Sequence, residues 1–216
     1  MTSRPAAGGG RWVSVDPERL TRWFAGFADR HGEPAATVDG AALLLTAPDG
    51  AVAECHPPPG VPAAGDVAGF VAAALVPRRV GLLLARRAAV AVGVAHGTDL
   101  LTHKVDSSYV QSRTAAGGWS QQRFARRRGN QAQAAAGSAA DIAARLLLPE
   151  RDRLAALVTG GDRRAVAAVL ADRRLAPLEP LRAERFLDVP DPRLAVLQKA
   201  AALTRQVPIR VREPVV

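Results

Sequence analysis

The chain has few of the residues that build disulfides, metal sites or membrane spans. Cys55 is its only cysteine among 216 residues, so no disulfide can form within the chain and a reducing compartment is expected. Its four histidines are scattered and no His-Glu-x-x-His motif occurs, so neither a metal nor another cofactor is expected. The longest apolar run, Val67–Val76, is too short to cross a bilayer. Residues 1–12 also lack the apolar core of a signal peptide. These absences predict a soluble, cytoplasmic protein with no membrane partner.

Lysine is also scarce. Of the 29 basic residues only Lys104 and Lys199 are lysines, and the formal net charge is +9. Such a charge favours polyanionic partners, including nucleic acid. Arginine is abundant together with alanine, however, as GC-rich coding produces, so basicity alone is weak evidence. Apolar residues make up 48% of the chain, which is enough for a core and excludes disorder throughout.

Helical and strand-like segments follow one another along the chain. Residues 1–12 are rich in glycine and predict a disordered tail. A helix should follow, capped by Asp16. A second, long helix over Ser120–Leu148 should end at Pro149, with Gly129 and Gly137 as places for a kink. Strands are expected at Val38–Leu45, Ala51–Cys55, Val80–Ala85, Ala89–Ala95, Asp99–Val105, Leu154–Val158 and Pro208–Val211, and further helices at Val67–Leu75, Arg164–Asp172 and Arg193–Arg205. This order predicts an α/β (α+β) sandwich, in which a mixed β-sheet has flanking helices, within one monomeric domain over residues 13–216.

One segment differs from the rest in its charge pattern. Residues 107–140 contain no Asp and no Glu, and five of the seven glutamines lie between Gln111 and Gln133. A solvated helix usually carries both charge signs. Positive charge with neutral amides instead suits contact with a phosphate backbone. The arginines of this segment are Arg113, Arg123, Arg126, Arg127 and Arg128.

Within that segment the sequence Gly117-Gly118-Trp119-Ser120-Gln121-Gln122 precedes the long helix. Paired glycines permit close backbone approaches, and Ser120 is a suitable N-cap. A helix start offers free N–H groups to an anion or a developing oxyanion. Trp119 stands where an exposed tryptophan suits a contact. The alternative is a glycine turn that only caps the helix. The glutamine cluster, the missing acids and the tryptophan together count against it.

The run Val105–Arg113, followed by Gly117–Arg128, resembles the Vms-one-like release factors (the VLRF group). These are relatives of the catalytic middle domain of the class-one release factors of eukaryotes and archaea. The similarity is strong over about residues 80–130 and weaker through Gly160-Gly161-Asp162 and the C-terminal helix. It implies a release-factor middle-domain-like fold with a long helix after the catalytic loop. It also implies peptidyl-tRNA hydrolysis on obstructed large ribosomal subunits, as in ribosome quality control, with the large subunit and peptidyl-tRNA as partners.

The sequence departs from the family pattern in one place. Release factors carry Gly-Gly-Gln and the eukaryotic quality-control relatives Gly-Gly-Ser-Gln, whereas here Trp119 separates the glycine pair from Ser120. Alignment on Ser-Gln implies that Gln121 is the functional glutamine, and alignment on the glycine pair leaves Gln122 open. The catalytic set implied by the resemblance is Gly117, Gly118, Ser120, Gln121 and Gln122. RNA contacts are expected from Trp119, Lys104, Arg113, Arg123, Arg126, Arg127 and Arg128.

Two other functions stay open: a tRNA 3′-end endonuclease, and a non-catalytic ribosome- or tRNA-binding domain. Other chemistries lack their motifs. Gln122 stands where a serine hydrolase needs the last glycine of Gly-x-Ser-x-Gly. Cys55 and His56 are adjacent and do not make a dyad. Gly160-Gly161-Asp162 lacks the lysine of a phosphate-binding loop and predicts a plain turn.

Overall fold

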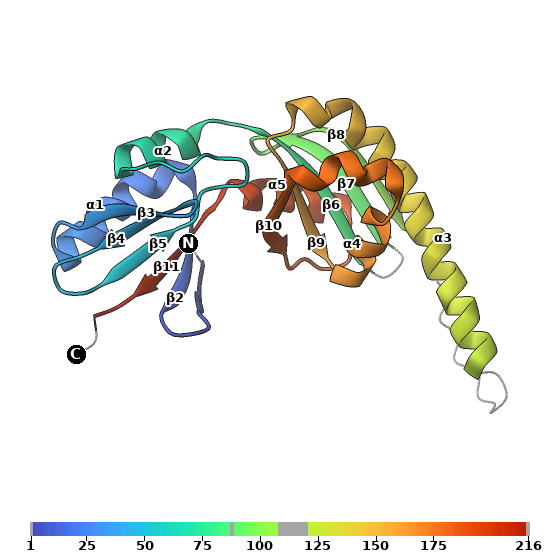
Figure 1. Cartoon of the computed structure of the whole chain (residues 1–216), viewed down its shortest axis with the longest axis horizontal. Helices are drawn as coiled ribbons and strands as arrows, with labels where there is room; N and C mark the ends of the chain where they lie inside the picture. The colour runs from blue at the N-terminus through green and yellow to red at the C-terminus, as the bar shows by residue number, and fades with distance from the viewer. Residues whose placement is uncertain (1, 87–88, 108–120, 215–216) are drawn as a thin grey trace. The chain divides into compact units, whose positions relative to one another are not determined.

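The computed structural model describes residues 2–86, 89–107 and 121–214. They form two compact units, Met1–Pro77 with Ala202–Val216, and Arg78–Ala201 (Figure 1). Each unit has its own β-sheet with helices packed on it, which confirms the expected α/β class. Where the sequence predicts one domain with one mixed sheet, the strands divide between two sheets.

The first unit is built on an antiparallel sheet of order β1-β2-β11-β5-β4-β3. Its strands are β1 (Thr2–Pro5), β2 (Arg11–Val15), β3 (Ala35–Asp39), β4 (Ala42–Thr46), β5 (Val52–Cys55) and β11 (Val207–Arg212). The short helix η1 (Pro17–Arg19) leads into α1 (Leu20–His31), and α2 is Val67–Leu75. Leu20, Phe24 and Phe27 of α1 and Phe70 of α2 share one core with the sheet, so the aromatic face expected in the first helix is confirmed as core.

The beginning of this unit differs from the sequence prediction. The segment expected as a disordered tail contains β1, which pairs with β2 over four residue pairs. Gly8, Gly9 and Gly10 all have positive φ and form the turn between the two strands. Asp16 does not cap α1: its carboxylate accepts a hydrogen bond from Gln206 Nε2 at 2.9 Å. The strand expected over residues 38–45 is a hairpin, because Gly40, with φ 58°, turns the chain between β3 and β4.

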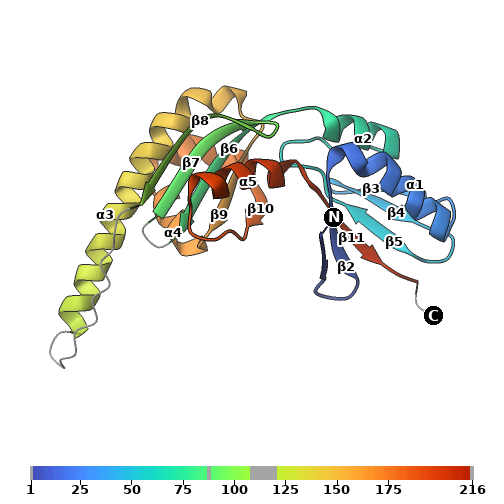
Figure 2. The same ribbon diagram turned by 180° about the vertical axis from the view of Figure 1, so that it is seen from behind.

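The second unit is built on a mixed sheet of order β10-β9-β6-β7-β8. Its strands are β6 (Arg79–Arg86), β7 (Ala89–His96), β8 (Asp99–Ser107), β9 (Ala156–Gly161) and β10 (Arg182–Leu187). Its helices are α3 (Gln121–Leu147), η2 (Leu148–Arg153), α4 (Arg163–Leu170), η3 (Arg173–Leu181) and the first two turns of α5 (Leu194–Arg205). Helices α3, α4 and η3 pack on one face of the sheet. Helix α5 covers the other face, where Leu197 lies against Gly93 (Figures 1 and 2).

Most elements of this unit agree with the sequence prediction. The hairpin of β6 and β7 and the neighbouring β8 are confirmed, and the long helix is continuous through Gly129 and Gly137 before Pro149 enters η2. Strand β10 was missed, because its sequence Arg-Ala-Glu-Arg-Phe-Leu alternates charged and apolar residues at the edge of a sheet and resembles a loop.

Gly160 and Gly161 end β9 and carry a structural role. Gly161 has φ +99°, and a Cβ there would lie 2.4 Å from the backbone oxygen of Ala85 on β6. Asp162 then caps α4, accepting a hydrogen bond from Ala165 N at 2.9 Å. The predicted plain turn is therefore a strand end that only glycine can form, followed by a helix cap.

We expect Gly161→Ala to lower the free energy of unfolding by roughly 2–4 kcal/mol, because strain at positive φ adds to a backbone clash. Urea denaturation measures the change. Gly137→Ala is the matched control, since nothing lies within 4 Å of its would-be Cβ in the middle of α3. That substitution should raise the free energy of unfolding by about 0.5–1 kcal/mol. Equal effects of the two substitutions would contradict the packing described at β9.

Candidate functional site

The candidate loop joins β8 to α3. β8 ends at Ser107, two residues after the predicted strand end, and α3 begins at Gln121, one residue after the predicted helix start. Gln121 and Gln122 are thus the first residues of the helix, and four of the predicted RNA-binding arginines follow within its first turns. These are Arg123, Arg126, Arg127 and Arg128. Five other predicted site residues lie outside the described residues, and their roles stay predictions. They are Arg113, Gly117, Gly118, Trp119 and Ser120.

Strand directions place this loop at one particular edge of the second sheet. β6 is parallel to β9 and β9 to β10, while β7 is antiparallel to both β6 and β8. Four strands therefore run in one direction, and their carboxyl ends meet at one edge. Ser107 pairs with Ala89 there, Arg86 pairs with the same residue, and Gly161 pairs with Ala85. In open α/β sheets this is the edge at which ligands bind.

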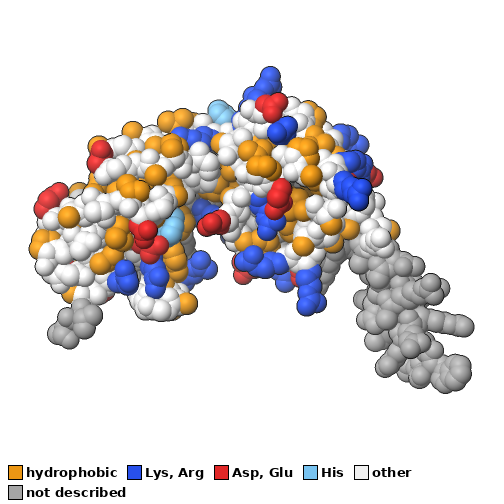
Figure 3. All heavy atoms as spheres, viewed as in Figure 1, with side chains coloured by type: hydrophobic (Ala, Val, Ile, Leu, Met, Phe, Trp, Pro, Cys, Tyr) orange, Lys and Arg blue, Asp and Glu red, His pale blue; other side chains and the backbone are white. Residues whose placement is uncertain are grey.

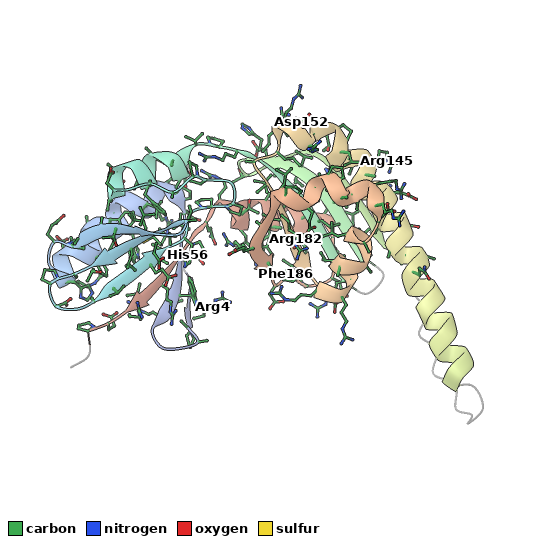
Figure 4. The ribbon with its side chains drawn as sticks, viewed as in Figure 1. Arg4, His56, Arg145, Asp152, Arg182 and Phe186 are labelled. Atoms are coloured by element: carbon green, nitrogen blue, oxygen red, sulfur yellow. The ribbon has the colours of Figure 1, made fainter. Side chains whose placement is uncertain are left out.

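Three more arginines lie at the same edge, and none of them belongs to the site residues predicted from the sequence. Arg86 Nη1 donates to the carbonyl of Val189 at 3.0 Å. The guanidinium carbon of Arg163, the first residue of α4, lies 4.3 Å from the ring centroid of Phe186 (labelled in Figure 4). Arg164 beside it is exposed. Only the strand order reveals this grouping, since these residues are far apart in the sequence.

Helix α3 is anchored to its unit by its last third. Gln133 and Ala134 are exposed, and fully buried side chains begin at Ala139. The buried residues of the anchor are Ala139, Ala140, Ile142, Ala143 and Leu147, which share a core with β6, β7, α4 and η3. At 1.5 Å per residue, Gln121 lies about 27 Å along the helix axis from this anchor. Figure 1 shows the beginning of α3 running on past the sheet.

An ion pair at the surface reinforces the anchor. Arg174 in η3 contacts Asp141 of α3 at 2.7 Å and Asp172 at 2.7 Å. The side-chain hydrogen bond from Arg174, with a second bond from its backbone N–H, lowers the pKa of Asp172 to about 2. Arg174 and Asp141 are exposed, so their ion pair contributes little to stability. The geometry nevertheless fixes η3 against the helix two residues beyond the start of the buried anchor.

Lys104 and His103 lie on β8, the edge strand next to the loop. Both side chains are exposed, as are those of Leu101 and Thr102, and among the described strands β8 is the edge of this sheet. Lys104 stands opposite Val92, three residues before β8 ends. The predicted strand placement is confirmed for both residues, and the predicted RNA contact of Lys104 stays a prediction.

Among the described residues, neither the Cys55-His56 pair nor a cluster of metal-ligating side chains offers a second catalytic site. Cys55 is fully buried, and burial raises the pKa of its thiol far above the usual range. His56 instead contacts Trp12 and Glu54. No group of three or more potential metal ligands occurs in the part of the chain that the structure describes. No helix among those residues is long and apolar enough to cross a membrane.

The family comparison agrees with the resemblance. A family profile described as the Actinobacteria/chloroflexi VLRF1 release factor matches residues 78–210. No curated protein matches the chain. Among solved structures, an archaeal translation termination factor, aRF1, is 15% identical with a TM-score of 0.41, and the alignment covers 90% of this chain and 66% of that one. A second solved structure, titled only "Archaeal protein", is 15% identical with a TM-score of 0.39. The alignment covers 72% of this chain and 48% of that one.

The family match begins where the second compact unit begins, at Arg78, and continues through α5 into β11. It includes β8, α3 and the segment between them, which carry the candidate loop. It spans more than half of the chain, and the chain therefore belongs to the VLRF1 release factors described from Actinobacteria and Chloroflexi.

Proposed function

We propose that this chain is a peptidyl-tRNA hydrolase that frees nascent peptides from tRNA on stalled or obstructed large ribosomal subunits. Its family is one of translation release factors. The proposal adds the substrate, the reaction and the residues that carry it, with Gln121 at the centre.

The observation that carries the proposal is the position of Gln121 at the start of α3, far along the helix from the part that packs on its own unit. The anchor of α3 begins at Ala139, about 27 Å from the glutamine. A single helix is about 10–12 Å wide with its side chains, so it is a narrow support. Such an arm suits an active site enclosed by RNA, and the missing acids of residues 107–140 keep it compatible with phosphates.

The reaction needs a water molecule to attack the ester carbonyl carbon that joins the peptide to the tRNA ribose. The ester C–O bond breaks, one proton of the water passes to the ribose oxygen to restore its hydroxyl, and the peptide leaves as a carboxylate whose proton goes to solvent. A glutamine amide does not titrate, so Gln121 can orient the water or bind the oxyanion but cannot act as a general base. The first N–H groups of α3 have no partner within the helix, and they favour a developing negative charge nearby.

One experiment separates this function from the two alternatives. Large subunits carrying peptidyl-tRNA are incubated with the protein, and peptide, tRNA and the conjugate are resolved. Free peptide with an intact tRNA supports the hydrolase. A shortened tRNA supports a 3′-end endonuclease, and an unchanged conjugate with bound protein supports a binding domain.

We expect the protein to sediment with large subunits in a salt-sensitive way, and Arg126→Glu with Arg127→Glu to weaken that binding. Phosphate contacts release counterions, and each lost contact should reduce the salt slope by about one. Co-sedimentation at several salt concentrations measures this. Arg145→Glu with Arg151→Glu is the matched control, because Arg145 is exposed within the anchored third of α3 and Arg151 is exposed in η2, both away from the start of the helix. Equal losses for the two pairs would show a general charge effect and contradict the assignment.

We expect Gln121→Ala to lower the single-turnover rate of peptide release by about 10²–10³, as removal of an oxyanion-hole donor does, while binding persists. An orienting group acts mainly in the transition state, so the rate should change more than the affinity. Gln122→Ala is the matched control, because Trp119 leaves the register uncertain by one position. An essential Gln122 with a dispensable Gln121 would shift the assignment by one residue. Wild-type rates in both variants and in the double variant would remove the catalytic role from this loop.

A further inference from the structure

The first unit presents one face of its sheet that neither α1 nor α2 covers. The core residues of those helices pack on the other face, against Val13, Ala53 and Ile209. Side chains alternate along strands, so the neighbours of these residues point to the opposite side, which we call the open face. On the side of the first unit that Figure 3 shows, histidine, basic and acidic side chains lie close together.

The strand register sets one row of side chains across all six strands of the open face. Adjacent strands lie about 4.8 Å apart, so successive members of the row are direct neighbours. In the order of the strands the row is Arg4, Trp12, Arg210, Glu54, Leu44 and Thr37. Trp12 therefore has an arginine on each side of it.

An aromatic pair stands at the centre of this face. The rings of Trp12 and His56 have their centroids 5.3 Å apart with an interplanar angle of 44°. Trp12 is half-buried, and the side chain of His56 is 37% exposed. Part of both rings is thus available to a ligand. Aromatic rings on a solvated sheet are the usual stacking platform for unpaired bases.

The charges around the aromatic pair favour a polyanion. Arg4 and Arg212 are exposed, and within the described residues neither forms an ion pair (Arg4 and His56 are labelled in Figure 4). Arg210 is held in place by its Nη2, which donates to the carbonyl of Ala7 at 2.9 Å. The opposing charge is Glu54, whose Oε1 lies 2.9 Å from Nε2 of His56.

We propose that the open face binds single-stranded RNA, with bases stacking on Trp12 and His56 and phosphates contacting Arg4 and Arg212. Residues 1–77, which supply most of the face, lie outside the family match. The inference is independent of the proposed hydrolysis, because it concerns another surface and a binding event. A protein partner could also use a tryptophan and arginines. Around the aromatic pair, however, three arginines stand against the one carboxylate of Glu54, and Asp39, the other acid of this face, lies on the far edge strand β3, so the balance near the rings favours a polyanion.

The test uses the full chain and a short, unstructured RNA that contains 4-thiouridine. Ultraviolet cross-linking and peptide mapping should place the RNA on the peptides that contain Trp12 and His56. In titrations with fluorescent oligoadenylate, Arg4→Glu with Arg212→Glu should weaken binding about tenfold and flatten its salt dependence. Trp12→Ala should weaken binding about five- to hundredfold, as expected for the loss of one stacked base.

Arg22→Glu with Arg30→Glu is the matched control, because it makes the same charge change at exposed positions of α1 on the covered side. It should retain most of the affinity. Equal losses in both charge variants, cross-links confined to the peptides of α3, or equal affinity for double-stranded RNA would each overturn the proposal. Because Arg4 and Arg212 are exposed, the charge variant tests it even if Trp12→Ala fails to fold. Peptide release measured in parallel separates this site from the proposed hydrolase, since either one can fail while the other stands.

Discussion

The packing of the last third of α3 on the second sheet is the constraint on which the candidate site depends. Leu147 lies against Gly81 of β6, where a Cβ would come within 3.3 Å of its side chain. The alanines of the anchor let the helix approach β7 closely. A tilt of ten degrees at this anchor would move Gln121 by about 5 Å at the far end of the arm. Catalysis requires positioning to about 0.5 Å. The anchor alone therefore cannot position Gln121 to the precision that catalysis needs. Contacts between the start of α3 and the surface it binds must fix the glutamine against the reacting ester.

Strand direction is the second constraint, because it brings the end of β8 and the start of α4 to the same edge of the sheet. Because β6, β8, β9 and β10 run the same way, the end of β8 shares an edge with the start of α4. Arg163 is held there by the ring of Phe186 and Arg86 by the carbonyl of Val189. Positive charge from other segments thus lies at the base of the arm. Arg86 also pairs with Asp191 and Asp162 caps α4 at this edge, so Arg163 and Arg164 are the residues there that offer positive charge to a polyanion.

The sequence predicted the elements of this chain better than their assembly. The long helix was predictable because no proline interrupts the chain between its start and Pro149. The β6–β7 hairpin was predictable because both strands are apolar between their end residues. The hairpin turn at Gly40-Ala41 could have been predicted from the sequence, since a glycine at the first position of a two-residue loop is typical of hairpin turns. The pairing of β11 with β2 and β5 joins residues about 150–200 positions apart, and local patterns carry no information on it. The edge arginines were missed for the same reason.

The charge pattern of α3 changes where its environment changes. The acid-free segment ends at Asp141, two residues after the buried anchor begins at Ala139. Asp141 gains an ion pair with Arg174, so an acid is useful at the position where the helix meets its own protein. Before the anchor, an acid placed beside phosphates would be repelled. Simple surface solvation would favour acids as much as arginines on the exposed part of such a helix. The boundary in composition thus coincides with the boundary between the part of α3 that packs on protein and the part that we propose to contact RNA.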